Sequence, residues 1–464
     1  MTDIDDTNIK RDHSQLFPPS RQKYYLLLPL VLYFALSLFY LVIVPTGESP
    51  DEGGHVQCIE QVSALNRLPI VDPKPEGISW SRTVALSGKL CYHMPLYYLS
   101  VGYLQRGIAA VTGTALHYEF PPTSPNGPSP AMFVHPPLEK IWTIEEPLTM
   151  SGSRVLSILL WGMMMAAVYG ITWLLWPESF RARLIAVTLL VGWPQFLFMS
   201  RAINNDALAV PLVAITLALL LKVGSPQRLI WATIVATLAI LSKFTVAFGL
   251  IVVAAAWLME TISFPQKRTA YLRVGLVMIV IICALAGLLY FQPVLNEHIN
   301  AVTDATSSRN PESGQLDYWL RVLALTMESG YVRFGMMNVI APHWQSWAWW
   351  SFIIFGLIIG VILYGRHIKV EKEVRIQTAI LVFWTVGVIA LYFRININRF
   401  QPQFRYLFPL LPVITAFVGI GYSWLTNKIE RDYWVVFPLA LVLFGLNVWI
   451  LRMVVLPGYW PALY

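Results

Sequence analysis

Apolar runs long enough to cross a membrane recur along most of the chain. The first, from about Tyr24 to Val44, has the ~20 residues that a bilayer span needs. No small-residue cleavage site follows it, so we expect a retained span and not a signal peptide. Ten further spans are predicted near 155–176, 184–200, 207–221, 229–241, 244–259, 274–291, 347–364, 376–393, 405–425 and 433–453. The pattern therefore predicts an all-α polytopic membrane protein with about eleven transmembrane helices.

The apolar run from Leu229 to Leu258 decides the number of spans. As one helix it would extend ~45 Å at ~1.5 Å per residue, which is too long for one upright crossing. Lys243 also interrupts it. Two short spans that meet at Ser242 and Lys243 fit better.

The distribution of basic residues sets the orientation, because short cytoplasmic loops are enriched in Lys and Arg. Eleven spans with a cytoplasmic N-terminus place every short basic segment on the cytoplasmic side. These segments contain Lys10, Arg11, Arg21, Lys23, Arg181, Arg183, Lys222, Arg228, Lys267, Arg268, Arg366 to Arg375, Lys428 and Arg431. We therefore expect a multi-pass protein of the plasma (inner) membrane.

The same topology divides the chain into a tail, one membrane domain and a short end segment. Residues 1–22 are polar and of mixed charge, typical of a disordered cytoplasmic tail. Residues 23–455 form the single transmembrane domain, with outer-face loops at 45–150 and 292–346, and 456–464 form a short outer tail. Apolar residues at helical spacing predict amphipathic helices in both loops. They lie in three segments: Val56 to Leu65, Pro95 to Val111, and Leu316 to Met327.

Composition supports a membrane protein and argues against nucleic-acid binding. The chain has 464 residues, of which 56% are hydrophobic and 13% charged, and its mean hydropathy is +0.58. A soluble globular protein is more polar. The net charge of +7 is modest, and no basic run is interleaved with aromatics as in nucleic-acid-binding proteins.

Two carboxylates and a histidine follow the first span at the point where it would emerge into water. Ser49 and Glu52 have the spacing of a capping box, with Pro50 at the first helical position. Glu52 is therefore either a cap or a catalytic group. Asp51 is not the capping residue in this arrangement, and it lies one helical turn before His55. This makes Asp51 a candidate general base.

Further charged residues gather at the predicted outer ends of later spans. They are Arg201, Asn204, Asn205 and Asp206, then Lys243, then Arg394, Arg399 and Arg405. Each cation alone could extend to lipid headgroups. As a set beside the carboxylates they could hold a phosphate while a carboxylate accepts a proton. His93, with Tyr97 and Tyr98 close behind it, lies where the second amphipathic segment begins at Pro95, and His135 lies in a Pro-rich loop.

These motifs, taken in order, resemble the GT-C superfamily of membrane glycosyltransferases, and within it a branch of uncharacterised bacterial membrane proteins. The matching stretches are Pro50-Asp51-Glu52 with His55, Asn66 to Pro69, His93 to Tyr98, Arg154 to Ser157, Ser200 to Leu208, Lys243-Phe244, Arg333 to Val339, and Arg405 to Pro412. The resemblance implies that Asp51 is the catalytic base and that outer-face basic residues hold a polyprenyl phosphate. His93-Met94-Pro95 departs from the usual His-Pro-Pro, which occurs intact at His135. No metal or other cofactor is implied, although a divalent metal remains possible.

The leading hypothesis is an inverting glycosyltransferase that moves a sugar from a polyprenyl-phosphate donor to an acceptor hydroxyl at the outer face. The partners are then the donor lipid, a glycan, lipid or protein acceptor, and membrane lipids. Asp51 and Glu52 are the expected catalytic residues. The expected substrate-binding residues are His55, His93, Tyr97, Arg201, Asp206, Lys243, Arg333, Arg405 and Tyr406. The alternatives are a lipid or sugar transporter, and an acyl- or phosphotransferase acting on lipids.

Cysteine placement leaves one further point open. Cys58 and Cys91 share the first outer loop, where disulfides persist. A bridge would hold the Asp51 segment against the His93 segment. Two free buried thiols are the alternative, because a pair in one loop need not meet the geometric limits for bonding.

Overall fold

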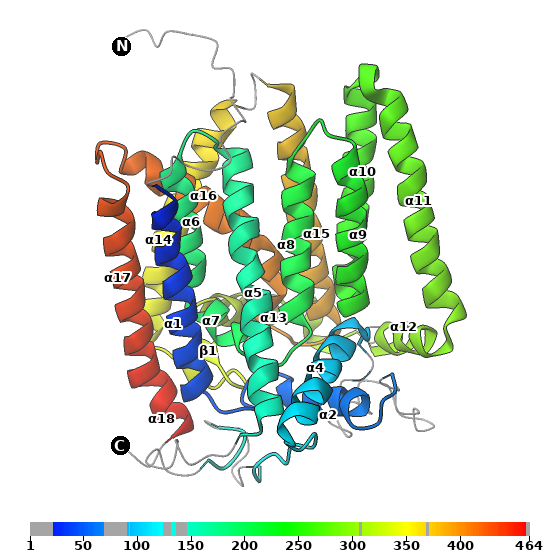
Figure 1. Ribbon diagram of the computed structural model, residues 1–464. Coiled ribbons are helices and arrows are strands. Elements are labelled where there is room, and N and C mark those ends of the chain that lie inside the picture. The colour runs from blue at the N-terminus through cyan, green and yellow to red at the C-terminus, as the bar shows by residue number, and fades with distance from the viewer. Residues whose placement is uncertain are drawn as a thin grey trace.

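The computed structural model describes residues 22–68, 91, 93–123, 131–135, 146–305, 309–367 and 371–460. The predicted N-terminal tail, apart from Gln22, and the last four residues lie outside this part. The described chain is a bundle of helices that run nearly parallel to one axis (Figure 1). The long elements are α1 (Leu27–Ile43), α5 (Leu148–Leu175), α6 (Phe180–Val191), α8 (Asp206–Leu221), α9 (Gln227–Ser242), α10 (Phe248–Ser263), α11 (Arg268–Phe291), α14 (His343–His367), α15 (Lys372–Asn398), α16 (Leu411–Leu425) and α17 (Tyr433–Ile450).

Each of the eleven predicted spans corresponds to an apolar helix, but not all are full-length spans. Eight helical segments of the described chain are long and apolar enough to cross a membrane, or nine if α6 and α7 (Pro194–Ser200) count as one broken span. The bend of 62° between α6 and α7 follows from Gly192 and Pro194, because proline cannot continue the hydrogen-bond ladder. α8 and α9 have only 16 residues each. The multi-pass all-α architecture is confirmed, and the structure shows that α8 and α9 are shorter than a full-length span.

The chain breaks at Lys243, as the length argument predicts. α9 ends at Ser242, and a short 3-10 helix, η3 (Phe244–Ala247), leads into α10. Lys243 itself is extended and stands between the two helices. Asp206 begins α8 and Lys243 follows the last residue of α9, so these two charged residues stand where the short helices join the neighbouring segments.

The loop segments and short helices gather at one end of the bundle, here called the loop end. It carries α2 (Glu52–Ser63), α4 (Leu96–Thr112) and α12 (Pro293–Ala305) (Figure 1). The second loop adds η5 (Pro311–Gly314), α13 (Leu316–Ser329) and the hairpin of β1 (Arg333–Phe334) and β2 (Val339–Ile340). The amphipathic helix predicted from Leu316 to Met327 is confirmed as α13. The two strands have only two residues each, which is too short to be predicted from the sequence pattern.

α2 differs from the surface helix that its apolar spacing predicted. Nine of its twelve residues are buried, including the polar residues His55 and Gln61. The reason is that α2 packs against α4, and a disulfide between Cys58 and Cys91 ties it to the next segment. The bridged alternative for these cysteines is therefore the correct one.

Close packing between α14 and α16 holds α16 in place, and the segment just before α16 carries a residue of the candidate site. Gly356 and Gly360 of α14 form a G-x-x-x-G motif that faces Gly421 and Phe417 of α16. A Cβ at Gly360 would lie 2.0 Å from the carbonyl oxygen of Phe417. Small residues of this kind let membrane helices approach closely. η6 (Phe404–Leu410) continues into α16, so the packing of α16 also positions Arg405. The last elements are η1 (Gln22–Leu26), η4 (Pro265–Lys267), η7 (Leu451–Val455) and α18 (Leu456–Tyr459).

Candidate active site

Asp51 lies in a backbone conformation that few residues adopt. Its φ is 66°, in the left-handed region, and it immediately precedes α2. This conformation starts the helix at Glu52 and not at Pro50, so the predicted helix start is two residues too early. Asp51 makes no side-chain capping bond, and its side chain is 41% exposed. Unusual conformations of this kind cluster at functional sites.

Glu52 has a different environment, although it is the next residue. It is 0% exposed, and its carboxylate accepts hydrogen bonds from the backbone N–H groups of Gly47 (3.0 Å), Ser49 (3.3 Å) and Ile203 (2.8 Å). Its bond to Ser49 is one half of the predicted capping box. The Ser49 hydroxyl makes no described hydrogen bond, so the other half is missing. Because no face of Glu52 is open to a substrate, the geometry favours a positioning role over the expected catalytic role.

Arg201 lies behind Glu52 in the interior. Its guanidinium is 3.6 Å from the Glu52 carboxylate and 4.6 Å from the ring centre of Phe198, and its side chain is 0% exposed. Arg201 therefore compensates the buried charge of Glu52. Among the described ion pairs, its carboxylate partner is Glu52, and the partner of Asp51 is Arg405.

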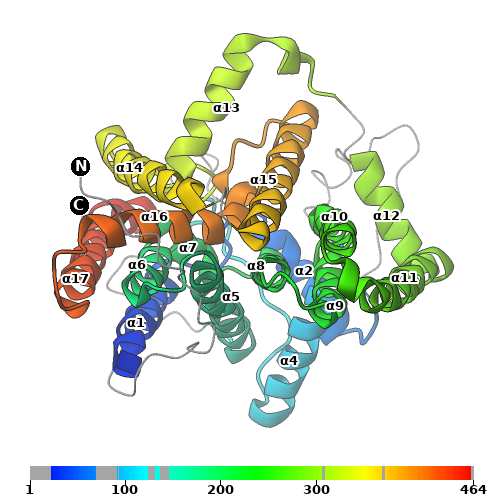
Figure 2. The same ribbon diagram turned by 90° about the horizontal axis from the view of Figure 1, so that it is seen from above.

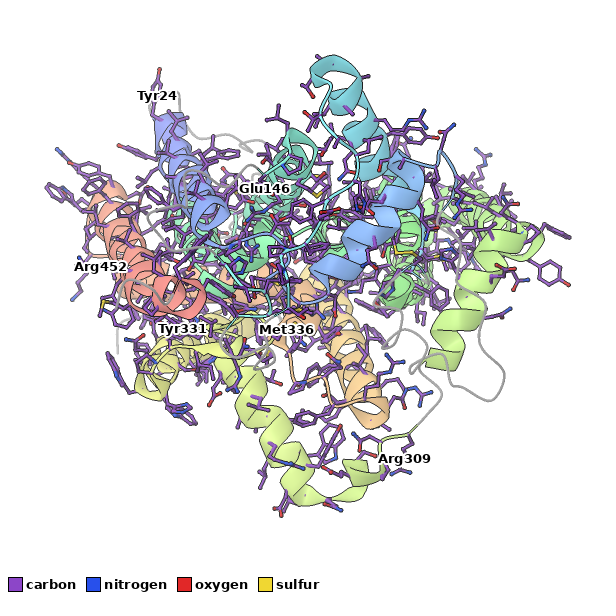
Figure 3. All side chains as sticks on the ribbon, turned by 90° about the horizontal axis from the view of Figure 1, so that it is seen from below. Tyr24, Glu146, Arg309, Tyr331, Met336 and Arg452 are labelled. Carbon is purple, nitrogen blue, oxygen red and sulfur yellow. A yellow bond between two sulfur atoms is a disulfide. The ribbon has the colours of Figure 1, made fainter. Side chains whose placement is uncertain are left out.

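Buried charges also hold the chain on the N-terminal side of Asp51. Arg154 of α5 donates to the Val44 carbonyl (2.7 Å) and to Glu146 (3.1 Å). Glu48 accepts from Met132 N (3.0 Å) and from His135 Nε2 (2.7 Å). Figure 3 shows Glu146 near the middle of the loop end. These bonds fix the segment that presents Asp51, and they place His135 beside Glu48.

Arg405 is the direct partner of Asp51. Its guanidinium donates to the Asp51 carboxylate, to the Pro50 carbonyl (3.4 Å) and to the Tyr406 hydroxyl (3.3 Å). Only 4% of the Arg405 side chain is exposed. The partly exposed carboxylate is thus held by a buried cation.

A second ion pair lies next to the first. Lys243 Nζ is 2.6 Å from Asp206 Oδ1, and both side chains are almost fully buried. The Tyr406 ring centre lies 5.7 Å from Lys243 Nζ and 5.2 Å from the Arg405 guanidinium carbon. Tyr406 therefore stands against both cations, and it joins the two ion pairs into one cluster.

Two histidines and a tyrosine complete the side near α2. His55 Nδ1 is 2.8 Å from the Tyr98 hydroxyl, and the His55 and His93 rings stack at 5.7 Å. His298 of α12 bonds the His93 carbonyl through Nδ1 at 2.6 Å. Tyr97, in contrast, lies near Ser157 at 3.5 Å and is fully buried. The structure thus places His93 at the cluster, whereas Tyr97 lies behind it, against the Tyr98 ring at 5.9 Å between centres.

The charges of the cluster set its protonation at neutral pH. Burial raises the pKa of Asp51, but Arg405 outweighs it and lowers the pKa to about 2. Burial lowers the pKa of His55 to about 3, against the attraction of Asp51. Burial, with help from His55 and Lys243, also lowers the pKa of His93. Asp51 is therefore ionised, while the two stacked imidazoles are neutral.

Arg333 lies outside this arrangement as far as its described contacts show. It pairs with Glu328, which also accepts from His343 Nδ1 at 2.8 Å. Tyr98 belongs to the His93 to Tyr98 stretch but is missing from the expected substrate-binding residues, although the structure places it in the cluster. His298 was not expected, because it lies in an unpredicted helix and in no motif. No three His, Cys, Asp or Glu side chains of the described residues converge as a metal site.

Comparison with known proteins identifies the architecture. A crystal structure of ArnT from Cupriavidus metallidurans bound to undecaprenyl phosphate superposes with a TM-score of 0.50 at 14% identity, over 95% of this chain and 74% of that one. The chain has a GT-C fold. This confirms the fold that the motif order predicted.

Two further comparisons complete the picture. The apo state of the same ArnT gives a TM-score of 0.48 at 14% identity, over 96% of this chain and 75% of that one. The model of the dolichyl-phosphate-mannose-protein mannosyltransferase family matches residues 135–286 of this GT-C chain, which include Asp206 and Lys243. No curated protein sequence matches the chain.

Proposed function

We propose that this protein is a glycosyltransferase that uses a polyprenyl-phosphate-linked sugar, with Asp51 as the general base. The observation that carries the proposal is the partly exposed Asp51 carboxylate beside two buried cations, Arg405 and Lys243. The GT-C fold and the match to a glycosyltransferase family support it. An undecaprenyl phosphate in the ArnT structure suggests the class of donor.

The reaction follows from the charges. Asp51 takes the proton of the acceptor hydroxyl, whose oxygen then forms a bond to the anomeric carbon. The bond from that carbon to the phosphate oxygen breaks, and polyprenyl phosphate leaves with one more negative charge than the donor had. Arg405 and Lys243 stabilise this developing charge, and such a contribution is worth about 3 kcal/mol per group. A single displacement inverts the anomeric configuration.

Donor binding would also prepare the base. Arg405 is paired with Asp51 and Lys243 with Asp206. A phosphate that draws Arg405 away removes the main cause that lowers the pKa of Asp51. Asp51 then becomes a stronger base only when the donor is present, because opposite charge is what favours its ionised form.

The site is assigned to the outer face of the plasma membrane, with the N-terminus in the cytoplasm. Asp51, Asp206, Lys243 and Arg405 lie at the loop end, while Arg181 and Arg228 occupy helix starts at the opposite end. Basic residues mark the cytoplasmic side. The Cys58–Cys91 disulfide at the loop end agrees, because disulfides persist in oxidising compartments.

The test is transfer from a synthetic polyprenyl-phosphate sugar labelled in the sugar. Purified protein with donor and acceptor-bearing membrane extract should form a labelled product and free polyprenyl phosphate. NMR of the product should show the anomeric configuration opposite to that of the donor. Movement of intact donor across a vesicle membrane without cleavage would contradict the proposal and favour a transporter.

A further inference from the structure

The His55 side chain is covered by the segment that leads into α4. His55 belongs to α2 and is only 2% exposed. The His93 ring stacks on it at 5.7 Å between ring centres, and the Tyr98 ring does so at 5.8 Å. Tyr98 lies within α4, but His93 lies before the helix begins at Leu96. The helix alone therefore does not fix the position of His93.

The disulfide attaches the chain directly beside the two stacked histidines. Cys58 follows His55 by one turn of α2, and Cys91 precedes His93 by two positions. The bond between the two sulfurs thus joins the two segments that carry the stacked rings. His298 makes a further contact with this segment, because its Nδ1 lies 2.6 Å from the His93 carbonyl oxygen.

The packing of α4 on α2 rests on other contacts. Gly102 of α4 lies against Val62 of α2, where a Cβ on the glycine would come within 2.6 Å of the valine side chain. Figure 2 shows α4 beside α2, and the two helices are in contact. Close contacts of this kind hold helices together without a covalent bond. Without the disulfide, α4 and Tyr98 should stay on α2, whereas the segment that carries His93 loses its covalent attachment.

The position of His93 matters because both imidazoles face the charges of the candidate site. The charges of Asp51 and Lys243 act on His55, and the same two charges act on His93. The stacked pair therefore forms one wall of the cluster that contains the proposed base. Neutral imidazoles offer both hydrogen-bond donors and acceptors, which suits the hydroxyl groups of a sugar.

We propose that the Cys58–Cys91 disulfide is a positioning element of the active site, which holds His93 on His55 beside Asp51, so that the site is complete only in the oxidised protein. When the bond forms, two thiols lose two protons and two electrons, and an external protein or small-molecule disulfide accepts them and becomes two thiols. Cys58 and Cys91 are 0% and 3% exposed, so this exchange must precede the packing of the segment. The consequence for sugar transfer rests on the proposed function, whereas the positioning of His93 does not.

The test is carbethoxylation of histidines by diethyl pyrocarbonate, measured for each residue by mass spectrometry on the full chain in detergent. The reagent reacts with neutral, accessible imidazoles, and the lowered pKa of His55 keeps it neutral, so its rate reports the cover. In wild type, the exposed His117 should react, while His55 and the buried His135 are protected. Cys58→Ser with Cys91→Ser should raise the rate at His55 at least about tenfold through local opening, with His135 still protected.

Three comparisons make this result decisive. Cys283→Ser removes the free, exposed cysteine and should leave His55 as protected as in wild type. His93→Ala removes the stacked ring but keeps the disulfide, so it should expose His55 by itself. Cys58→Ala with Cys91→Val must behave like the serine pair, so a folding defect in one pair of substitutions cannot decide the outcome.

Two carbethoxylation results would overturn the proposal. One is continued protection of His55 in the cysteine variants or in His93→Ala. The other is equal loss of protection at His135 in both cysteine pairs, which would show that the bond supports the whole loop end and not the position of His93.

Transfer supplies a readout that a purely structural role would not produce. The paired serine substitutions and His93→Ala should slow transfer by a similar factor. All three changes together should slow it no further, because substitutions that act through the same ring are not additive. Additive losses would show that the disulfide acts by another route and would contradict the proposal. If wild type shows no transfer at all, the proposed function fails, while the carbethoxylation results still decide the role of the disulfide.

Discussion

The Arg405 guanidinium donates a hydrogen bond to the Asp51 carboxylate across 354 positions of the chain. One partner stands at the start of α2 and the other in η6, which leads into the buried α16. The cation that would hold a donor phosphate therefore already neutralises the group that would act as base. A donor phosphate bound there would therefore compete with Asp51 for Arg405.

Removal of either cation should weaken donor binding. Lys243→Ala and Arg405→Ala should each cost about 1.5–3 kcal/mol of affinity for polyprenyl phosphate, the range for hydrogen bonds to charged groups. Titration of purified variants with polyprenyl phosphate measures this. Arg321→Ala is the control, because Arg321 pairs with Glu312 on the exposed surface. Unchanged affinity in both site variants would place the phosphate elsewhere.

Glu52→Gln should destabilise the protein more than it alters binding. The change keeps the shape but leaves the buried Arg201 without its counter-charge, and breaking a buried pair costs about 3–5 kcal/mol. Thermal unfolding should show a clear fall in Tm. Glu312→Gln breaks an exposed pair and should cost no more than about 1 kcal/mol. Equal Tm values for the two variants would contradict the positioning role of Glu52.

The disulfide gives a prediction about both chemistry and stability. Mass spectrometry of denatured, alkylated, non-reduced protein should find only Cys283 modified, because Cys58 and Cys91 are bonded to each other. Cys58→Ser with Cys91→Ser should lower stability by about 3–4 kcal/mol in the chain-entropy model. Detection of alkylated Cys58 and Cys91 before reduction would rule the bridge out.

The lowered pKa of His55 predicts that the protein becomes less stable as the pH falls. Its pKa falls from 6.5 to about 3 on folding, so the unfolded state takes up the proton first as the pH drops below 6.5. The free energy of unfolding therefore decreases from about pH 6.5 towards about pH 3. His55→Gln should flatten part of this decrease in a series of unfolding curves. His117→Gln, at an exposed histidine, should leave it unchanged, and an identical slope in wild type and His55→Gln would refute the assignment.

Most of the architecture could be predicted because apolar length and basic loops are local properties of the sequence. The break at Lys243 and the helix at α13 followed directly from length and periodicity. The burial of α2 could not be predicted, because its polar residues His55 and Gln61 are buried by long-range partners, among them Tyr98 and Cys91. Sequence spacing does not show such partners.

The site was partly predictable for a similar reason. Carboxylates and cations at the ends of apolar runs are conspicuous, so Asp51, Asp206, Lys243 and Arg405 could be selected. The pairing of these residues could not be predicted. The two ion pairs, Asp51 with Arg405 and Asp206 with Lys243, depend on how distant helices pack. The different surroundings of Asp51 and Glu52 could not be predicted either. They depend on the left-handed backbone conformation of Asp51, with φ 66°, which directs two adjacent carboxylates apart.

The most direct test of the central claim is the transfer rate of Asp51→Asn with labelled polyprenyl-phosphate sugar. Asparagine keeps the size of the side chain but cannot accept the proton. We expect transfer to fall by about 10²–10⁴-fold, with donor binding retained or tightened because Arg405 loses its carboxylate partner. Asp317→Asn, at the first turn of α13, should transfer at the wild-type rate. Transfer by Asp51→Asn at about a tenth of the wild-type rate or more, a barrier change of only ~1.4 kcal/mol, would show that Asp51 is not the base.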